Sequence, residues 1–232
     1  MEIFNISYIL LAIVVPLAVS VILHEVSHGY IANMKGDNSA KRLGRLTLNP
    51  IAHIDLVGTI ILPISLFYLV GFAFGYAKPV PINITNFKNP KQDMALVAAA
   101  GPFMNILLAV IAAILYKSVV SLDATILQEF NYFLQDSSVS LSHPVFILLL
   151  SALYFMVVIN IILAVINLIP IPPADGSRIF AWALPDDLAE QYSKIEPYGI
   201  FLLLGLFIFN PFHIVDYTIR PIIAWAAYIL FL

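Results

Sequence analysis

The stretch NISYILLAIVVPLAVSVILHEVSHGYIANM, residues Asn5–Met34, decides the fold of this chain. No charged side chain occurs between Ile3 and Leu23, and a helix of that length crosses a hydrocarbon core of about 30 Å. The composition agrees, because 61% of the 232 residues are hydrophobic and 11% are charged. An ordinary soluble domain has about 25% charged residues, so we predict a membrane protein.

Five more apolar segments follow, and together they predict an all-α polytopic membrane protein with about six membrane segments. They are Leu56–Gly75, Met94–Tyr116, Pro144–Leu168, Tyr198–Phe209 and Ile214–Leu232. The polar stretches between them are too short to form a separate soluble domain of ordinary size. We therefore predict one domain over residues 1–232, with a catalytic core at about 5–178 and a C-terminal helical hairpin at about 198–232.

The segment Leu56–Gly75 differs from the others because basic residues flank it on both sides. Lys and Arg are enriched in cytoplasmic loops, so both flanks are expected on the cytoplasmic side. This favours a re-entrant hairpin over a complete span. The sequence AKPVPIN, Ala77–Asn83, contains two prolines and cannot continue a helix. We predict that it forms a short extended, β-like element associated with the membrane.

Two features of the composition limit the possible partners and ligands. The net charge of −3 argues against a nucleic-acid partner. The absence of cysteine excludes disulfides, thiol nucleophiles and thiolate ligands. A metal site in this chain must therefore use His, Asp, Glu or water.

The motif HEVSH, His24–His28, lies near the end of the first apolar helix. Histidines at i and i+4 share one helix face, so both imidazoles can reach a single Zn²⁺. Glu25 lies beside them and can take a proton from water activated by the metal. Short matches to this motif also occur by chance. However, a charged side chain in a membrane helix costs about 3 kcal/mol on insertion scales, which favours a functional site.

A catalytic zinc requires a third protein ligand, and Asp175 is the strongest candidate. It lies in NLIPIPPADG, where three prolines end the preceding helix and Gly176 permits a turn. The alternative is an ordinary proline-rich turn. Counting spans from the first helix brings Asp175 to the same membrane side as the histidines, which the distribution of Lys and Arg predicts to be cytoplasmic.

Three motifs together resemble the site-2 protease family of intramembrane zinc metalloproteases (peptidase M50-like). They are HEVSH, AGPFMN at Ala100–Asn105 and NLIPIPPADG at Asn167–Gly176. NPIAHIDLVGT at Asn49–Thr59 and GYAKPVPIN at Gly75–Asn83 are similar to its minimal bacterial branch, which lacks a PDZ domain. One departure is Ala174, where members of the family usually have Leu before Asp-Gly.

The resemblance implies one Zn²⁺ per chain, held by His24, His28 and Asp175, with Glu25 as general base. It also implies that Asn167 holds the substrate or stabilises the developing oxyanion. The expected substrates are membrane-spanning proteins within the lipid bilayer, cleaved in a bacterial cytoplasmic membrane towards its cytoplasmic side.

Three further residues are less specific. His53 is expected either to contact the substrate or support the site, or to be a hydrogen-bonded loop histidine. Gly101 and Asn105 are expected to serve close helix packing, because small residues let membrane helices approach.

A metal-handling membrane transporter or channel is the alternative function. Transporters usually distribute polar residues over several spans and often contain inverted repeats. The ionisable residues here are concentrated in HEVSH and at Asp175, and the sequence contains no internal repeat. These features favour the protease.

Overall fold

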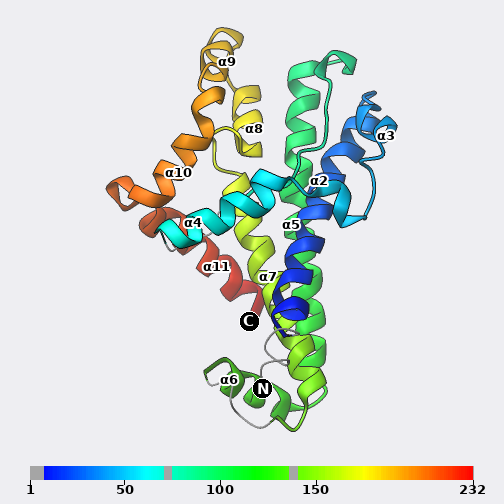
Figure 1. The fold of residues 1–232 in the computed structure, drawn as a ribbon, viewed down its shortest axis with the longest axis vertical. Coiled ribbons are helices and arrows are strands. Elements are labelled where there is room, and N and C mark those ends of the chain that lie inside the picture. The colour runs from blue at the N-terminus through cyan, green and yellow to red at the C-terminus, as the bar shows by residue number, and fades with distance from the viewer. Residues whose placement is uncertain (1–7, 71–74, 136–140, 232) are drawn as a thin grey trace.

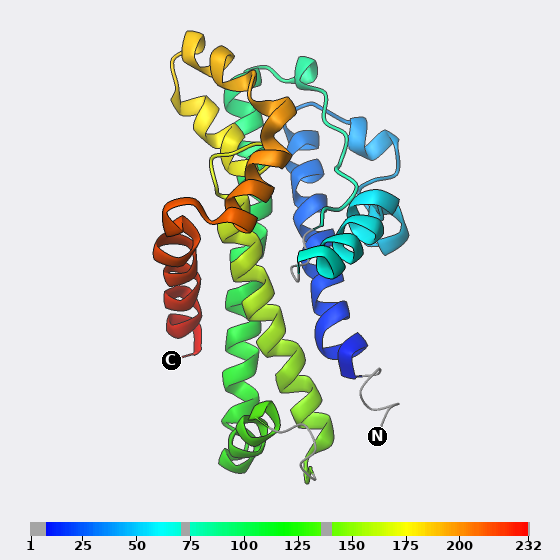
Figure 2. The ribbon, with the colours of Figure 1, turned by 60° about the vertical axis from the view of Figure 1, so that its left-hand side comes forward.

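The computed structural model describes residues 8–70, 75–135 and 141–231, and every regular element in these ranges is helical. Three long helices lie side by side: α2 (Val15–Met34), α5 (Pro90–Val120) and α7 (Pro144–Asn167) (Figures 1 and 2). The π-helical turn η1 (Leu10–Val14) precedes α2. The expected start of this first helix at Asn5 lies outside the described residues. The prediction of an all-α polytopic fold is confirmed.

Five described helices are long and apolar enough to cross a membrane, which agrees with this fold. They are Leu10–Met34, Pro90–Val120, Pro144–Asn167, Asp186–Phe209 and Pro211–Phe231. We call the two ends of the three-helix bundle the Pro90 end and the Val120 end, after the first and last residues of α5. Helix α2 runs towards the Pro90 end, α5 away from it and α7 back to it (Figure 1).

Local sequence explains where the long helices begin and end. Pro90 and Pro144 occupy the first turns of α5 and α7. The N–H groups of a first turn have no partner within the helix, so a proline there costs no hydrogen bond. Gly36, with φ of 107°, follows the last residues of α2 and takes the left-handed conformation that ends many helices. Helix α7 ends three residues before Pro170, which cannot continue the ladder.

Small residues let the three helices approach closely. Helix α5 packs most extensively against α7 and α2. Its buried positions are almost all small: Ala95, Val97, Ala98, Gly101, Pro102, Asn105, Ala109, Ala112 and Ala113. In a membrane, where lipid is as apolar as leucine, close backbone contact of this kind replaces the hydrophobic effect as the main source of helix association.

The re-entrant segment consists of η3 (Leu56–Ile61) and α4 (Leu62–Val70). Their 15 residues (6 and 9) reach roughly 22 Å, which is too short for a span of about 30 Å. The chain then returns beside its own start, where Tyr76 N donates to Gly58 O at 3.0 Å. The two ends of the segment therefore lie side by side, as the hairpin prediction requires, and its re-entry into a membrane stays a prediction. Gly71 lies outside the described residues.

Residues 75–83 form the extended element, which lies against α2 without forming a regular strand. Lys78 N donates to His53 O at 2.9 Å, and Arg45 Nη2 donates to Lys78 O at 2.7 Å. These partners belong to the loop between α2 and α4, which contains α3 (Ser39–Arg42) and η2 (Pro50–His53).

Asp37 connects the loop after α2 to the end of the extended element. Its carboxylate accepts from Asn83 N at 2.7 Å and from Asn86 Nδ2 at 2.8 Å, beside the turn η4 (Ile84–Asn86). Burial alone would raise the pKa of Asp37, but these bonds and those from Ser39 outweigh it and lower the pKa below its usual value. The carboxylate thus stays ionised and fixes the connection at neutral pH.

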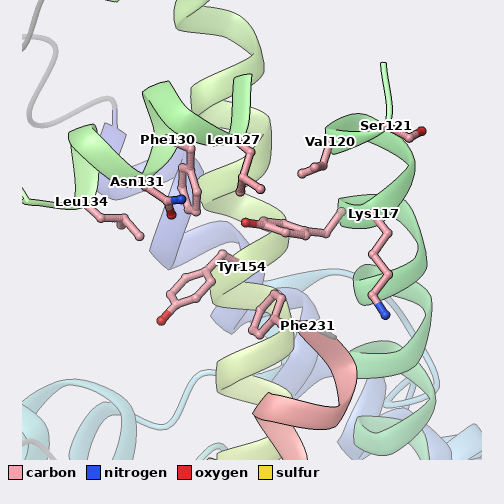
Figure 3. A pocket seen from close by; sticks show the side chains of 10 residues that line it. Lys117, Val120, Ser121, Leu127, Phe130, Asn131, Leu134, Tyr154 and Phe231 are labelled. Atoms are coloured by element: carbon pink, nitrogen blue, oxygen red, sulfur yellow. The ribbon is translucent and has the colours of Figure 1, made fainter. Parts of the chain in front are cut away.

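At the Val120 end, the short helix α6 (Ala124–Gln135) covers the bundle. It buries Ile126, Phe130 and Phe133 and turns its polar face outwards, as expected of an interfacial helix. Figure 3 shows the cavity of about 520 Å³ beside it. Aromatic side chains line this cavity, among them Phe130 of α6, Tyr154 of α7 and Phe231 near the C-terminus, and the cavity lies at the opposite end of the bundle from HEVSH. Asp136, in the same polar stretch, lies outside the described residues.

The C-terminal part starts at the Pro90 end with α8 (Asp175–Ala183), α9 (Asp186–Ser193) and η5 (Glu196–Tyr198). The predicted hairpin is an open bend in the structure: α10 (Gly199–Phe209) and α11 (Arg220–Phe231) both lead away from the Pro90 end (Figures 1 and 2). Gly199 lies against Pro172, whereas Phe231 stacks on Tyr154. Between α10 and α11 lie η6 (Pro211–His213) and η7 (Val215–Ile219), where left-handed backbone at Asn210, Phe212 and His213 makes the bend.

Candidate metal centre

The two histidines of HEVSH lie one turn apart on the buried face of α2. His24 and His28 are each 7% exposed, and their rings meet edge to face with centroids 4.6 Å apart. Their Nε2 atoms are separated by 3.0 Å. The i, i+4 spacing thus directs both imidazoles to one point inside the bundle, as the sequence predicted.

Asp175 completes the group from another part of the chain. Its Oδ2 lies 3.2 Å from His24 Nε2 and 3.3 Å from His28 Nε2. The three side chains are the described His, Asp and Glu residues whose ligand atoms cluster within 4.8 Å of one another. The count of membrane spans brought Asp175 to the histidine side of the membrane, and the structure brings it into contact with them.

Contacts on either side of α8 fix the position of Asp175. A Cβ on Gly176 would lie 2.2 Å from Leu168 O, so only glycine lets α8 lie this close to the end of α7. Gly176 was expected to permit a turn, but it is helical and serves close approach instead. At the other end of α8, Lys91 Nζ donates to Leu184 O at 2.6 Å. Helix α8 is therefore held to both α7 and α5.

The converging atoms fit a zinc ion. When both imidazoles carry their proton on Nδ1, both Nε2 atoms are acceptors, and Asp175 Oδ2 is buried without a hydrogen-bond partner among the described residues. Tetrahedral zinc with bonds of about 2.0 Å to nitrogen and oxygen separates its ligand atoms by about 3.3 Å. The observed separations of 3.0, 3.2 and 3.3 Å lie at or just below this value. A cation between the three atoms would relieve the repulsion between their lone pairs.

Helix α5 orients both imidazoles through their Nδ1 atoms. His24 Nδ1 lies 2.6 Å from Asn105 Oδ1, and His28 Nδ1 lies 2.7 Å from Val97 O. Between these contacts, a Cβ on Gly101 would lie 2.5 Å from atoms of both rings. Positions 97, 101 and 105 are four residues apart and share one face of α5.

Sequence reasoning missed this role, because it expected Gly101 and Asn105 to serve helix packing alone. The signal was available in AGPFMN: a glycine and an amide at i and i+4 in a membrane helix place a gap and a polar group on one face. In a chain with two histidines at the same spacing, that face is the natural partner of the histidines.

Glu25 lies next to the two ligands but has its own contact. Its Oε2 accepts from Val80 N in the extended element at 3.2 Å. Val80 is buried and packs beside Gly29, where a Cβ would lie 3.0 Å from its side chain. The extended element thus lies directly against the HEVSH turn.

The structure does not bring Asn167 and His53 into the ligand group. Asn167 Nδ2 donates to Leu163 O within α7 at 2.9 Å. His53 is 3% exposed, and its Nε2 lies 2.9 Å from Thr47 O. Its Nδ1 is buried and has no hydrogen-bond partner among the described residues. His53 therefore supports the loop that carries the extended element, and its role towards substrate stays a prediction.

Comparison with known proteins identifies the family. The model of peptidase family M50 matches residues 12–206. "Putative zinc metalloprotease YwhC" of Bacillus subtilis is 35% identical over 196 residues, which cover 84% of this chain and 80% of that protein. "Putative zinc metalloprotease Rip2" of Mycolicibacterium smegmatis is 26% identical over 190 residues, which cover 82% of this chain and 63% of that protein. No solved structure matches this chain.

The family match covers HEVSH on α2, the face of α5 that contacts the histidines, and Asp175 at the start of α8, which all lie within residues 12–206. The resemblance to site-2 proteases is confirmed by the family match and by the level of identity to YwhC. This chain is a multi-pass membrane protein that belongs to peptidase family M50.

Proposed function

We propose that this protein is an intramembrane zinc endopeptidase that hydrolyses peptide bonds in the membrane-spanning segments of other proteins. The observation that carries the proposal is the convergence of His24 Nε2, His28 Nε2 and Asp175 Oδ2 beside Glu25, inside a helical bundle. The names of YwhC and Rip2 support zinc as the metal.

The residues divide the chemistry between them. His24, His28 and Asp175 would hold the ion, which polarises a carbonyl and lowers the pKa of water from about 16 towards 7 when it is bound. Glu25 acts as the general base: it accepts the proton of the attacking water and passes it to the leaving amine. Its bond from Val80 N keeps the carboxylate beside the histidines without neutralising it.

Asn167 supplies an amide donor at the end of α7, three residues before the first of the three prolines that precede Asp175. We assign it to the substrate carbonyl oxygen, where a donor stabilises the negative charge that develops during attack. In the substrate-free protein its N–H is used within α7, by Leu163 O. Binding of the substrate would exchange that internal acceptor for the substrate carbonyl.

A helical substrate must unwind before its peptide bond can reach the site. Residues that weaken helices, such as Gly, Pro and Asn, should therefore favour cleavage. The re-entrant segment presents Phe67, Tyr68 and Leu69 as exposed apolar side chains, which suits contact with lipid and with a substrate helix. We propose that the site faces the cytoplasmic side of a bacterial membrane, as the basic loops at the Pro90 end suggest.

The test is zinc content together with cleavage by the purified, reconstituted chain. We expect about one zinc per chain and cleavage of a model membrane helix. Asp175→Ala should lower both, because two histidines alone do not complete the site. Asp187→Ala, which removes an exposed carboxylate of α9, is the matched control. Zinc binding without cleavage, combined with zinc flux into liposomes, would favour the transporter instead.

A further inference from the structure

A chain of hydrogen bonds leads from His24 into the middle of the bundle. Beyond the contact of His24 Nδ1 with Asn105 Oδ1, Asn105 Nδ2 donates to Asn160 Oδ1 at 2.8 Å. Asn160 Nδ2 donates in turn to Ser20 Oγ at 2.7 Å, and Ser20 Oγ donates to Pro16 O at 2.7 Å. Asn105, Asn160 and Ser20 are all 0% exposed, and they belong to α5, α7 and α2.

The chain can run in only one direction. The oxygen and nitrogen of an amide are told apart by their partners, and a backbone carbonyl is an acceptor only. Asn160 places one side of its amide 2.7 Å from Met156 O, so that side must be the NH₂ group. Asn160 Oδ1 therefore faces Asn105 as an acceptor, which requires the NH₂ group of Asn105 there.

The same reasoning fixes the proton of His24. Once the NH₂ group of Asn105 is used by Asn160, its oxygen faces His24, so His24 must donate from Nδ1. A neutral imidazole carries one proton, and Nε2 is left with the lone pair that a metal requires. His28 reaches the same tautomer directly, because its Nδ1 meets the acceptor Val97 O.

The two ligands thus differ in what holds them. A backbone carbonyl orients His28, and no side-chain change at position 97 removes it. His24 depends on a side chain, and that side chain is oriented by a third one on another helix. Each of these polar groups has a hydrogen-bond partner, so the network needs no water or further ligand to explain it.

We propose that Asn105 is a positioning residue that holds His24 in the Nδ1–H tautomer, and that Asn160 sets the orientation of Asn105. The proposal rests on the zinc site of the proposed function. The competing explanation is that Asn105 and Asn160 only join helices, since amides commonly hydrogen-bond across membrane helices. The two explanations predict opposite outcomes for two substitutions at position 105.

Asn105→Leu keeps the size of the side chain and removes the acceptor. Asn105→Asp keeps the acceptor towards His24, removes the donor to Asn160 and places a charge in a buried site. If the acceptor at position 105 positions His24, Asn105→Leu should weaken zinc binding by about tenfold to a hundredfold, the range seen when hydrogen-bond partners of metal ligands are removed. The zinc affinity of Asn105→Asp should remain within about threefold of the wild-type value, because carboxylates commonly accept from the second ring nitrogen of zinc-bound histidines. A packing role predicts the reverse ranking.

The measurement is zinc affinity by competition with a chelator, on the full chain in lipid nanodiscs. Asn160→Leu should weaken binding less than Asn105→Leu, because the acceptor remains but is free to rotate. Ser151→Ala is the control, since Ser151 is also 0% exposed on α7 and its Oγ donates to Ile147 O, outside this network. Wild-type zinc affinity in Asn105→Leu, or a higher zinc affinity in Asn105→Leu than in Asn105→Asp, overturns the proposal. Wild-type zinc affinity in Asn160→Leu overturns the part of the proposal in which Asn160 sets the orientation of Asn105.

A spectroscopic measurement decides the tautomer without any variant of the network. In ¹⁵N-histidine-labelled, zinc-free protein, the signals lost on His24→Gln should show a protonated Nδ1 and an unprotonated Nε2. A protonated Nε2 at His24 overturns the proposal even if Asn105→Leu fails to fold. Failure of the wild type to bind zinc would instead contradict the proposed function, so the two failures are distinguishable.

Discussion

The two sides of the HEVSH turn are built in different ways. On one side, α5 holds His24 and His28 through Asn105 and Val97 O, in a fully buried contact between two regular helices. On the other side, a single backbone N–H, that of Val80, holds Glu25 from an extended element bounded by prolines. The proposed metal ligands are thus fixed by rigid packing, whereas the proposed base is held by a segment with few hydrogen bonds to the bundle. A protease that must admit a substrate needs both properties at once.

The sharpest way to separate the two sides is to change the base alone. Glu25→Gln should retain zinc, because its ligands are intact, and lose turnover by about 10²- to 10⁴-fold, because glutamine cannot accept a proton. Zinc content and cleavage of a model membrane helix are measured on the same preparation. Glu190→Gln, on an exposed face of α9, should leave both unchanged. Substantial cleavage by Glu25→Gln would remove Glu25 from the role of base.

The ligand side should be sensitive to a single methyl group. In Gly101→Ala, the new Cβ would lie 2.5 Å from atoms of both imidazoles, a distance that real side chains do not reach. We expect at least a tenfold loss of zinc affinity, comparable to removal of a partner of the ligands. The measurement is chelator competition.

Gly205→Ala is the matched control for Gly101→Ala. A Cβ at position 205, on α10, meets only Phe209 at 4.0 Å. Alanine is favoured over glycine in helices by about 1 kcal/mol, so this variant should be at least as stable as the wild type, with the same zinc affinity. Normal zinc binding by Gly101→Ala would mean that α5 can shift away from α2, contrary to the close packing of these two helices.

The sequence predicts the ligand side better than the side of the base, and particular residues show why. HEVSH and the Asp-Gly after three prolines carry their geometry in local spacing, so His24, His28 and Asp175 could be named as candidate ligands that the structure brings together. Asn105 could be seen as a polar group in a membrane helix but not as the partner of His24, because that depends on the rotation of α5 against α2. The contact of Val80 with Glu25 is made by backbone, and no residue type encodes it.

The same distinction applies to the fold. The long apolar run that starts with Pro144 predicts α7 to within one residue, whereas the predicted span Met94–Tyr116 stops four residues short of α5 at each end. The re-entrant segment follows from its length and its basic flanks. The path of residues 199–231 could not be predicted, because the bend depends on left-handed backbone at Phe212, a residue type that rarely adopts it. Apolar composition gives the number of segments but not the direction in which each one runs.

On the side of the base, Val80→Pro should have an intermediate effect. Proline deletes the N–H that donates to Glu25, and hydrogen bonds to charged groups contribute about 1.5 to 3 kcal/mol. We expect turnover to fall by about tenfold while zinc affinity stays at the wild-type level. This split between activity and zinc binding is the opposite of the result expected for Gly101→Ala. Equal losses of both would show that the extended element also supports the metal ligands.

The smallest effect concerns the outer edge of the extended element, where an unwound substrate could add as a strand. The N–H groups of Tyr76, Lys78 and Val80 are all used by the protein itself. Pro79 and Pro81 have no N–H, so Ala77 is the one N–H donor of residues 76–81 without a partner among the described residues. Of the carbonyls on the alternate positions, Pro79 O already lies 3.5 Å from Arg45 Nη2. A substrate strand would therefore pair mainly by donating its own N–H groups.

Ala77→Pro removes that donor and leaves Glu25, Val80 and the ligands untouched. If the substrate pairs with this edge, KM should rise by about threefold to tenfold, which corresponds to the loss of one hydrogen bond, while kcat and zinc content stay unchanged. The alternative is that residues 75–83 only connect the re-entrant segment to α5 and do not contact the substrate. An unchanged KM in Ala77→Pro, together with reduced turnover in Val80→Pro, would leave the extended element the single task of holding the base. A raised KM in Ala77→Pro would instead divide the element between its two edges, with the inner one serving Glu25 and the outer one serving the substrate.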